Sequence, residues 1–74
     1  MQKILNKVVY TSPPTKCDIC QGNIADMFVD GATTAGPWAN MCPKCYGFYG
    51  RGLGTGKGQK YEKQPNGTFL KTAG

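Results

Sequence analysis

The feature that most constrains this chain is a pair of Cys-x-x-Cys motifs, Cys17-Asp-Ile-Cys20 and Cys42-Pro-Lys-Cys45, separated by 21 residues. Two residues between thiolates let the backbone fold around one ion, so that both sulfurs reach it and inner amides donate hydrogen bonds to sulfur. Each motif then supplies half of a tetrahedron. Because this doubled spacing is typical of structural zinc sites, we expect one Zn²⁺ to be bound by Cys17, Cys20, Cys42 and Cys45.

The length of the chain makes such a site useful. The chain has 74 residues, of which 39% are hydrophobic, 11 are glycine and 5 are proline. A chain this short buries too little apolar surface to offset the entropy of ordering its backbone without help. A structural metal contributes of the order of 10 kcal/mol to folding. We therefore expect residues 1–74 to form a single zinc-binding domain.

The N-terminal sequence bears on the compartment. The stretch MQKILNKVVYTSPPTKC has no apolar h-region and no small-residue cleavage site, so it does not resemble a secretory signal. No apolar run approaches the ~20 residues needed to span a bilayer. We expect a cytoplasmic protein with no membrane partner. In a reducing cytosol, paired cysteines bind metal more often than they oxidise, which favours the metal site over two disulfides.

Other chemistries for the four cysteines fit the sequence less well. A thioredoxin-like redox motif needs a strand–helix α/β setting that this chain is too short to hold. A catalytic zinc site keeps an open position, usually beside His, Asp or Glu, whereas four thiolates fill the shell and the sequence has no histidine. We therefore expect no enzyme activity, no catalytic residue and no small-molecule substrate. Iron stays open as the alternative metal, because four thiolates also suit it.

The order of apolar runs and chain breakers predicts a small metal-stabilised α+β fold. Strands are expected at 4–10, 24–30 and 38–41, with a hairpin signal at Asp30-Gly31. Pro43 fits the first position of a short helix at 43–49. Pro65-Asn66-Gly67 predicts a C-terminal hairpin that joins residues 60–63 to 68–71. The metal core is expected at 17–49, a glycine-rich basic segment at 50–60 and the hairpin at 61–71.

The cysteine motifs also carry a family resemblance. Cys17-Asp-Ile-Cys20-Gln-Gly22 with Cys42-Pro-Lys-Cys45 resembles the zinc-ribbon and treble-clef zinc fingers. In a treble clef, a knuckle and a hairpin precede a helix whose first turn carries the second cysteine pair, and Pro43 favours this version. The resemblance implies a zinc knuckle, a β-hairpin and a short helix. In the knuckle we expect Gly22 to supply a positive φ.

Two further resemblances suggest other contexts. Residues 17–61, about 45 of the 74 residues, are similar to small four-cysteine proteins of unassigned function from tailed-phage genomes. This similarity implies the host cytoplasm as the location. Rubredoxins also pair CxxC with CPxC after an aromatic residue, as Trp38 stands here, which implies iron and electron transfer. They are typically acidic, however, and have glycine where Tyr46 follows Cys45, so a rubredoxin-like carrier is the remote alternative.

The net charge of +5 lies in the second half of the chain. Residues 1–41 carry three lysines and three aspartates, whereas residues 42–74 carry six basic residues and one glutamate. A dication on four thiolates would leave the protein near +3. Basic side chains and glycine amides contact phosphates, and aromatic rings stack on unpaired bases. We therefore expect contact with single-stranded nucleic acid through Lys44, Arg51, Lys57, Lys60, Tyr61 and Lys63.

The glycine-rich stretch does not match a nucleotide-binding loop. Gly56-Lys57 lacks the glycine five residues earlier, where Arg51 stands, and lacks the following Ser or Thr of a Walker motif. A protein-interaction adaptor, phage-encoded and acting on a host protein, is the alternative function. In either case we expect Trp38 and Phe48 in the core, since large aromatics are usually buried.

Overall fold

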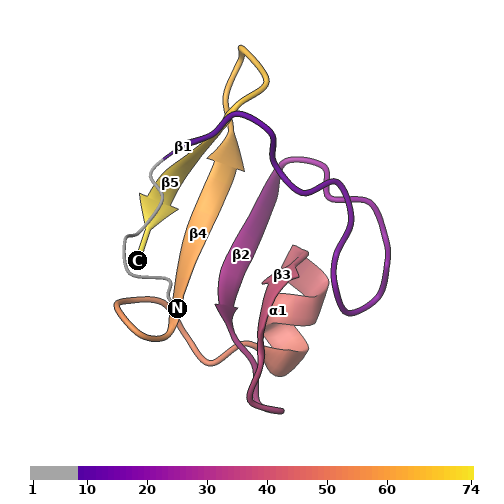
Figure 1. Cartoon of the computed structure of the whole chain (residues 1–74), viewed down its shortest axis with the longest axis vertical. Helices are drawn as coiled ribbons and strands as arrows, with labels where there is room; N and C mark the ends of the chain where they lie inside the picture. Colours follow the sequence, from indigo (N-terminus) through magenta and orange to yellow (C-terminus); the bar gives the residue numbers. More distant parts are fainter. Residues whose placement is uncertain (1–8) are drawn as a thin grey trace.

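The structure is a computed structural model that describes residues 9–74 (Figure 1). Along this part of the chain the elements are β1 (Val9–Tyr10), β2 (Met27–Ala32), β3 (Trp38–Met41), α1 (Pro43–Tyr49), β4 (Gly58–Lys63) and β5 (Phe69–Ala73). The strands pair antiparallel in the order β1-β5-β4-β2-β3. The prediction of a small α+β fold is thereby confirmed.

Strand β2 separates two buried clusters, because successive side chains of a strand point to opposite faces of the sheet. Val29 of β2 lies in the first, which we call the cysteine cluster; its buried members are Cys17, Val29, Met41 and Cys45. The neighbouring Phe28 lies in the second, the aromatic cluster, formed by Phe28, Tyr61 and Phe69. The cysteine cluster and the aromatic cluster therefore lie on different sides of one strand.

The short strand β1 shows that the sheet is curled. It pairs with β5 at one edge of the sheet, yet the ring of Tyr10 packs edge-on 4.8 Å from Tyr61 and 5.4 Å from Phe28, between ring centroids. The Tyr10 hydroxyl also donates a hydrogen bond of 3.3 Å to Oδ2 of Asp30 on β2. Tyr10 thus reaches past the neighbouring β5 to Tyr61 on β4 and to Phe28 and Asp30 on β2, so β1 folds across the aromatic cluster and covers it.

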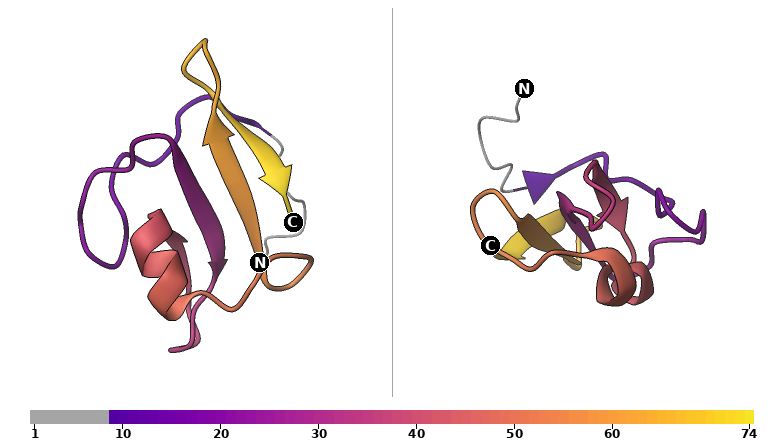
Figure 2. Two further views of the ribbon diagram at one scale, coloured as in Figure 1. Left: turned by 180° about the vertical axis from the view of Figure 1, so that it is seen from behind. Right: turned by 90° about the horizontal axis from the view of Figure 1, so that it is seen from below.

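Helix α1 begins where the sequence predicted and covers one end of the sheet. Pro43 occupies its first turn, directly after the extended Cys42, and Gly50 ends it by donating its amide to the carbonyl of Tyr46 at 2.9 Å. The helix packs against β2 and β3 and leaves β4 and β5 uncovered on that side (Figure 2). No helix within residues 9–74 has the length and apolar character needed to cross a membrane.

The C-terminal hairpin is also confirmed. β4 ends at Lys63, β5 begins at Phe69, and Gly67 between them has a φ of 90°. The stretch between α1 and β4 is a series of turns in which three glycines, Gly52, Gly54 and Gly56, have positive φ. Glycine is needed there because other residues rarely adopt that conformation.

The hairpin signal at Asp30-Gly31 is wrong. β2 runs through both residues to Ala32, and the chain reverses between residues 33 and 37, where the Gly36 amide bonds the Thr33 carbonyl at 2.9 Å. Gly31 serves close packing instead, since a Cβ there would lie 2.8 Å from the carbonyl oxygen of Lys57. The strand predicted at 24–30 begins only at Met27. Of the strand predicted at 4–10, residues 4–8 lie outside the described residues.

The expectation that Trp38 and Phe48 lie in the core is also wrong. Their exposed fractions are 44% and 69%. Helical periodicity explains the exposure of Phe48. The face of α1 that meets the sheet carries Cys42, Cys45 and Tyr46, and Phe48 lies outside this face. On β3, Ala39 and Met41 pack into the cysteine cluster. Because side chains alternate along a strand, Trp38 points to the opposite face and is exposed.

Candidate metal centre

The structure brings the four cysteines of the two motifs together. The four Sγ atoms, of Cys17, Cys20, Cys42 and Cys45, lie within 4.8 Å of one another, and none of the four residues forms a disulfide. Two of them are buried and Cys20 is exposed at the surface. Four thiols in one small space are the donor set of a structural Cys₄ site, which suits zinc and also iron.

The first cysteine pair lies in a tight knuckle formed by residues 17–22. The amide of Ile19 donates to Sγ of Cys17 at 3.4 Å, and the amide of Gly22 donates to Sγ of Cys20 at 3.3 Å. The Cys17 amide also donates to the Gly22 carbonyl at 2.9 Å. These bonds point the two sulfurs inward and place amide hydrogens on them, as expected from the spacing of the motif.

The expectation for the φ angle at Gly22 is wrong. The residue with a positive φ in the knuckle is Gln21, at 64°, and Gly22 is not among the glycines with positive φ. Gly22 is favoured for a different reason, since a Cβ at this position would lie 3.2 Å from Sγ of Cys20. The absent side chain leaves room for that sulfur next to the backbone.

The second cysteine pair is positioned by the start of α1. Cys42 is the residue before the helix, and Cys45 lies in its first turn. The Tyr46 amide donates to the Cys42 carbonyl at 2.9 Å, which closes this turn. The Sγ atoms of Cys20 and Cys42 lie 3.9 Å apart, so the knuckle and the helix meet at the sulfurs.

Asp18 joins the knuckle to β3. Its backbone amide donates to the Asn40 carbonyl at 2.9 Å, and its Oδ2 accepts the Asn40 amide at 2.8 Å. This pair resembles one rung of a β-ladder, with a carboxylate replacing a carbonyl. The position of Asp18 inside the first motif was a signal for this role, which was not predicted from the sequence. The contact fixes the distance between the two cysteine pairs, because Asn40 is two residues before Cys42.

The environment of the sulfurs favours a bound cation. Burial raises the pKa of Cys17, but hydrogen bonds from the backbone amides of Cys20, Cys42 and Ile19 outweigh it and lower that pKa to about 6. Burial and contacts with the other three sulfurs raise the pKa of Cys45 to about 12. One thiolate is thus favoured, while several adjacent thiolates repel one another, and a dication would remove that repulsion.

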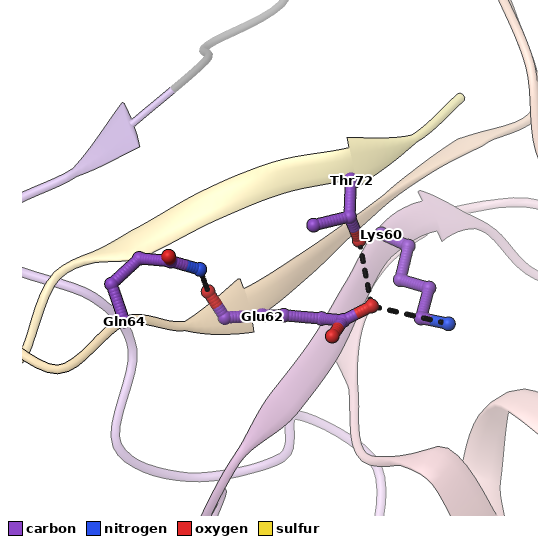
Figure 3. Close-up of polar contacts among 4 residues, drawn as sticks. All are labelled: Lys60, Glu62, Gln64 and Thr72. Carbon is purple, nitrogen blue, oxygen red and sulfur yellow. Dashed lines mark hydrogen bonds and ion pairs between the residues drawn. The ribbon is translucent and has the colours of Figure 1, made fainter.

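The basic residues expected to contact nucleic acid come from separate elements of the fold. Lys44 lies in the first turn of α1, and Arg51 follows the end of the helix. Lys60 and Lys63 both belong to β4, but strand alternation points them to opposite faces. Nζ of Lys60 also forms an ion pair with Oε2 of Glu62 at 3.4 Å (Figure 3).

Tyr61 must be removed from the expected contact residues. It is 1% exposed and stacks on Phe28, with ring centroids 5.1 Å apart. A base therefore has no access to its ring. The sequence placed Tyr61 between lysines, and the alternation of β4 turns it to the aromatic cluster while Lys60 and Glu62 face the other side. Figure 3 shows the polar contacts of that other side, where Thr72 and Lys60 bind Glu62.

An open groove of about 510 Å³ lies beside the cysteines. Its lining comes from the knuckle, the turn at 33–37, β3 and the end of α1, and consists of Asp18, Ile19, Thr33, Ala35, Pro37, Trp38, Ala39 and Tyr49. Three of these are exposed large apolar side chains, Ile19, Trp38 and Tyr49. This groove was not predicted from the sequence, because Trp38 was expected in the core.

Comparison of the chain with known proteins gives no family model, no curated protein and no solved structure that matches. The similarity to phage proteins therefore stays an expectation from the sequence. What is established about the site comes from its geometry, which is a four-cysteine cluster able to bind one metal ion.

Proposed function

We propose that this chain is a non-catalytic binding module built around one structural Zn²⁺ in a treble-clef-like site. The observation that carries the proposal is the set of four sulfurs within 4.8 Å of one another. The order of a knuckle, the β2–β3 hairpin and a helix that carries the second pair supports the treble-clef assignment. Because free thiols persist in reducing compartments, the cytoplasm is the proposed location.

Metal analysis tests this proposal directly. Native mass spectrometry of the purified protein should give one zinc per chain, and a chelator should remove both the zinc and the folded state, because metal binding supplies folding free energy. Iron in place of zinc would support the electron-carrier alternative. A folded, metal-free chain with two disulfides would refute the structural role.

A matched pair of variants separates metal binding from general stability. Cys42→Ser removes one ligand, so metal content and thermal stability should both fall steeply. Ser12→Ala changes an exposed residue before the knuckle, and both quantities should stay at the level of the parent protein. Equal metal content in the two variants would show that Cys42 is not a ligand.

For the partner, we propose single-stranded nucleic acid, bound weakly and with little sequence preference. The support is the positive charge of the second half of the chain and the surface of α1. Lys44 and Arg51 stand at the two ends of the helix, and Phe48 and Tyr49 are exposed on it with ring centroids 6.1 Å apart. These two rings replace Tyr61 as the proposed stacking residues.

Fluorescence anisotropy with labelled oligonucleotides across a salt series tests this proposal. Phosphate contacts give a slope of about −0.7 per neutralised phosphate on a single strand, so affinity should fall steeply with salt. Lys44→Glu with Arg51→Glu should abolish binding and leave the metal in place. Lys57→Glu with Lys60→Glu tests the glycine-rich segment and β4 in the same way. Lys16→Glu reverses the charge of an exposed lysine outside the proposed contact residues and is the control for a change in charge.

The adaptor function is the second candidate, and the groove beside the cysteines favours it. An exposed apolar groove that contains the only tryptophan of the chain is unusual for a surface that contacts solvent alone. Apolar protein contacts respond little to salt, so the same salt series separates this candidate from binding to nucleic acid.

A further inference from the structure

The groove runs along the outer edge of β3, the last strand of the sheet. Its floor and walls are mostly apolar, with Trp38 and Tyr49 as the two aromatic rings and Ile19 and Pro37 beside them. A side chain of moderate size entering it would leave water and contact several of these groups at once. Removal of apolar surface from water in this way favours binding.

Backbone groups are also available at this edge. Ala32 is the partner of Trp38 in the β2–β3 ladder, but it donates its amide to the carbonyl of Lys57, on the β4 side, and not to Trp38. The Pro37 carbonyl accepts the Thr33 amide, and in a trans peptide the next amide, that of Trp38, points the opposite way. Trp38 therefore directs its amide outward, as Asn40 directs its own amide to Asp18 two residues later.

The edge of β3 is thus half covered. Asp18 pairs with Asn40, while the peptide group of Trp38 faces the groove, where the described part of the chain places no further strand. An extended segment of another protein laid along this edge would continue the sheet by one strand. Strand addition of this type takes affinity from main-chain hydrogen bonds and specificity from pockets for alternate side chains.

The charge around the groove indicates which charge the side chains of the bound segment should carry. Asp18 is the only charged residue among the groove-lining residues. With Zn²⁺ bound, four thiolates carry a net charge of −2, and Ile19 of the groove lies between two of them in sequence. A phosphate backbone would be repelled here, whereas lysine or arginine side chains would be attracted.

From these observations we propose that the groove binds an extended peptide segment of a partner protein in which apolar and basic side chains alternate. The apolar side chains occupy the space beside Trp38 and Tyr49, the basic ones lie near Asp18, and the peptide backbone pairs with Trp38. The inference rests on the proposed zinc only for part of the negative charge. Of the residues proposed to contact nucleic acid, only Tyr49 also lines this groove.

Trp38 reports on this groove directly, because it is the only tryptophan in the chain. The probe is a capped heptapeptide of alternating lysine and valine, titrated into the metal-loaded protein with excitation of tryptophan alone. We expect a saturable blue shift of the Trp38 emission. The same peptide with glutamate in place of lysine should give no shift, and the lysine peptide with all internal amides N-methylated should bind about three- to tenfold more weakly.

Three variants, each checked for metal content, locate the binding through anisotropy of the labelled lysine–valine peptide. Trp38→Ala should weaken binding about tenfold or more, as expected for a central aromatic. Phe48→Ala removes a more exposed ring outside the groove and should leave peptide binding unchanged. Asp18→Asn keeps an oxygen for the Asn40 amide but removes the charge, and should weaken binding about two- to fivefold.

Several results would overturn this inference. The first is the absence of an emission shift with the lysine peptide. The second is an equal shift with the glutamate peptide or the N-methylated peptide. The third is an equal loss of peptide affinity in Trp38→Ala and Phe48→Ala. A shift produced by an oligonucleotide, or by raising the protein concentration alone, would assign the groove to nucleic acid or to a second copy of the chain. A protein that lacks zinc but still binds the lysine peptide would refute the metal proposal and leave the groove proposal standing.

Discussion

At the residue scale, Gln21 is the position where local geometry and residue type conflict. It is the only non-glycine residue with a positive φ in the described part of the chain. A left-handed conformation costs roughly 1–2 kcal/mol for residues with a Cβ. The adjacent Gly22 has the opposite property, because its φ is ordinary while its missing side chain makes room for Sγ of Cys20. Position 21 therefore has the φ that favours glycine, whereas position 22 needs glycine for space and not for φ.

This conflict gives a prediction for the knuckle. Gln21→Gly should raise the free energy of unfolding by about 1 kcal/mol, since strain relief exceeds the entropy cost of a new glycine. Gly22→Ala should lower it and weaken metal binding, because the added methyl group presses on Sγ of Cys20. Chemical denaturation of the metal-loaded variants measures the first effect, and chelator competition measures the second. Destabilisation by Gln21→Gly would show that the side chain is needed at that position.

At the element scale, α1 has two glycines with different surroundings. A Cβ on Gly47 would meet no atom within 4 Å, whereas a Cβ on Gly50 would overlap the ring of Tyr46. Tyr46 packs against the cysteine cluster. Gly47, inside the helix, therefore only lowers helix propensity. Gly50, at the end of the helix, is required because any side chain there would overlap Tyr46.

Alanine substitutions should separate these roles. Gly47→Ala should stabilise the protein by up to about 1 kcal/mol, which is the propensity difference between the two residues inside a helix. Gly50→Ala should destabilise it, because the ring of Tyr46 must move away from the cysteine cluster. Thermal denaturation of both variants is the measurement. Equal effects of the two substitutions would contradict the packing derived for Gly50.

Comparison of the predicted and observed elements shows which parts of the fold could be predicted from the sequence. The helix at 43–49 and the C-terminal hairpin follow from strong local signals, Pro43 and Pro65-Asn66-Gly67, and both are confirmed. The cysteine cluster follows from the spacing of the motifs. Gly36-Pro37 predicts a break before the returning strand, but the hairpin turn itself is expected too early, at Asp30-Gly31, whereas the actual need for Gly31 is its close approach to β4. Such contacts between distant segments leave no local pattern.

At the scale of the whole molecule, closure of the sheet by β1 depends on Tyr10. The pKa of Tyr10 is raised above its ordinary value of 10.0 by burial, by the carboxylate of Asp30 and by the nearby Tyr61. Folded protein therefore holds this phenol proton at a pH where the unfolded chain releases it. The stability from this group is complete below pH 10.0 and is lost as the pH rises above that value.

Tyr10→Phe tests this linkage. The variant should be less stable at neutral pH by about 1–2 kcal/mol, because it loses the hydrogen bond to Asp30. Its stability should fall less steeply than that of the parent protein above pH 10.0, because the titrating group is absent. Thermal denaturation across an alkaline pH series measures both. Parallel curves for the two proteins would show that Tyr10 ionisation does not contribute.

The contact between Asp18 and β3 also bears on how copies of this chain behave when the metal is lost. Exposed strand edges are templates for pairing between molecules, and natural proteins cover or charge them. Here the cover is a carboxylate held in place by a metal knuckle. Chelation should unfold the knuckle and release the part of β3 around Asn40, so the metal-free protein should assemble into β-rich fibres that raise thioflavin fluorescence. The metal would then keep the protein soluble as well as folded.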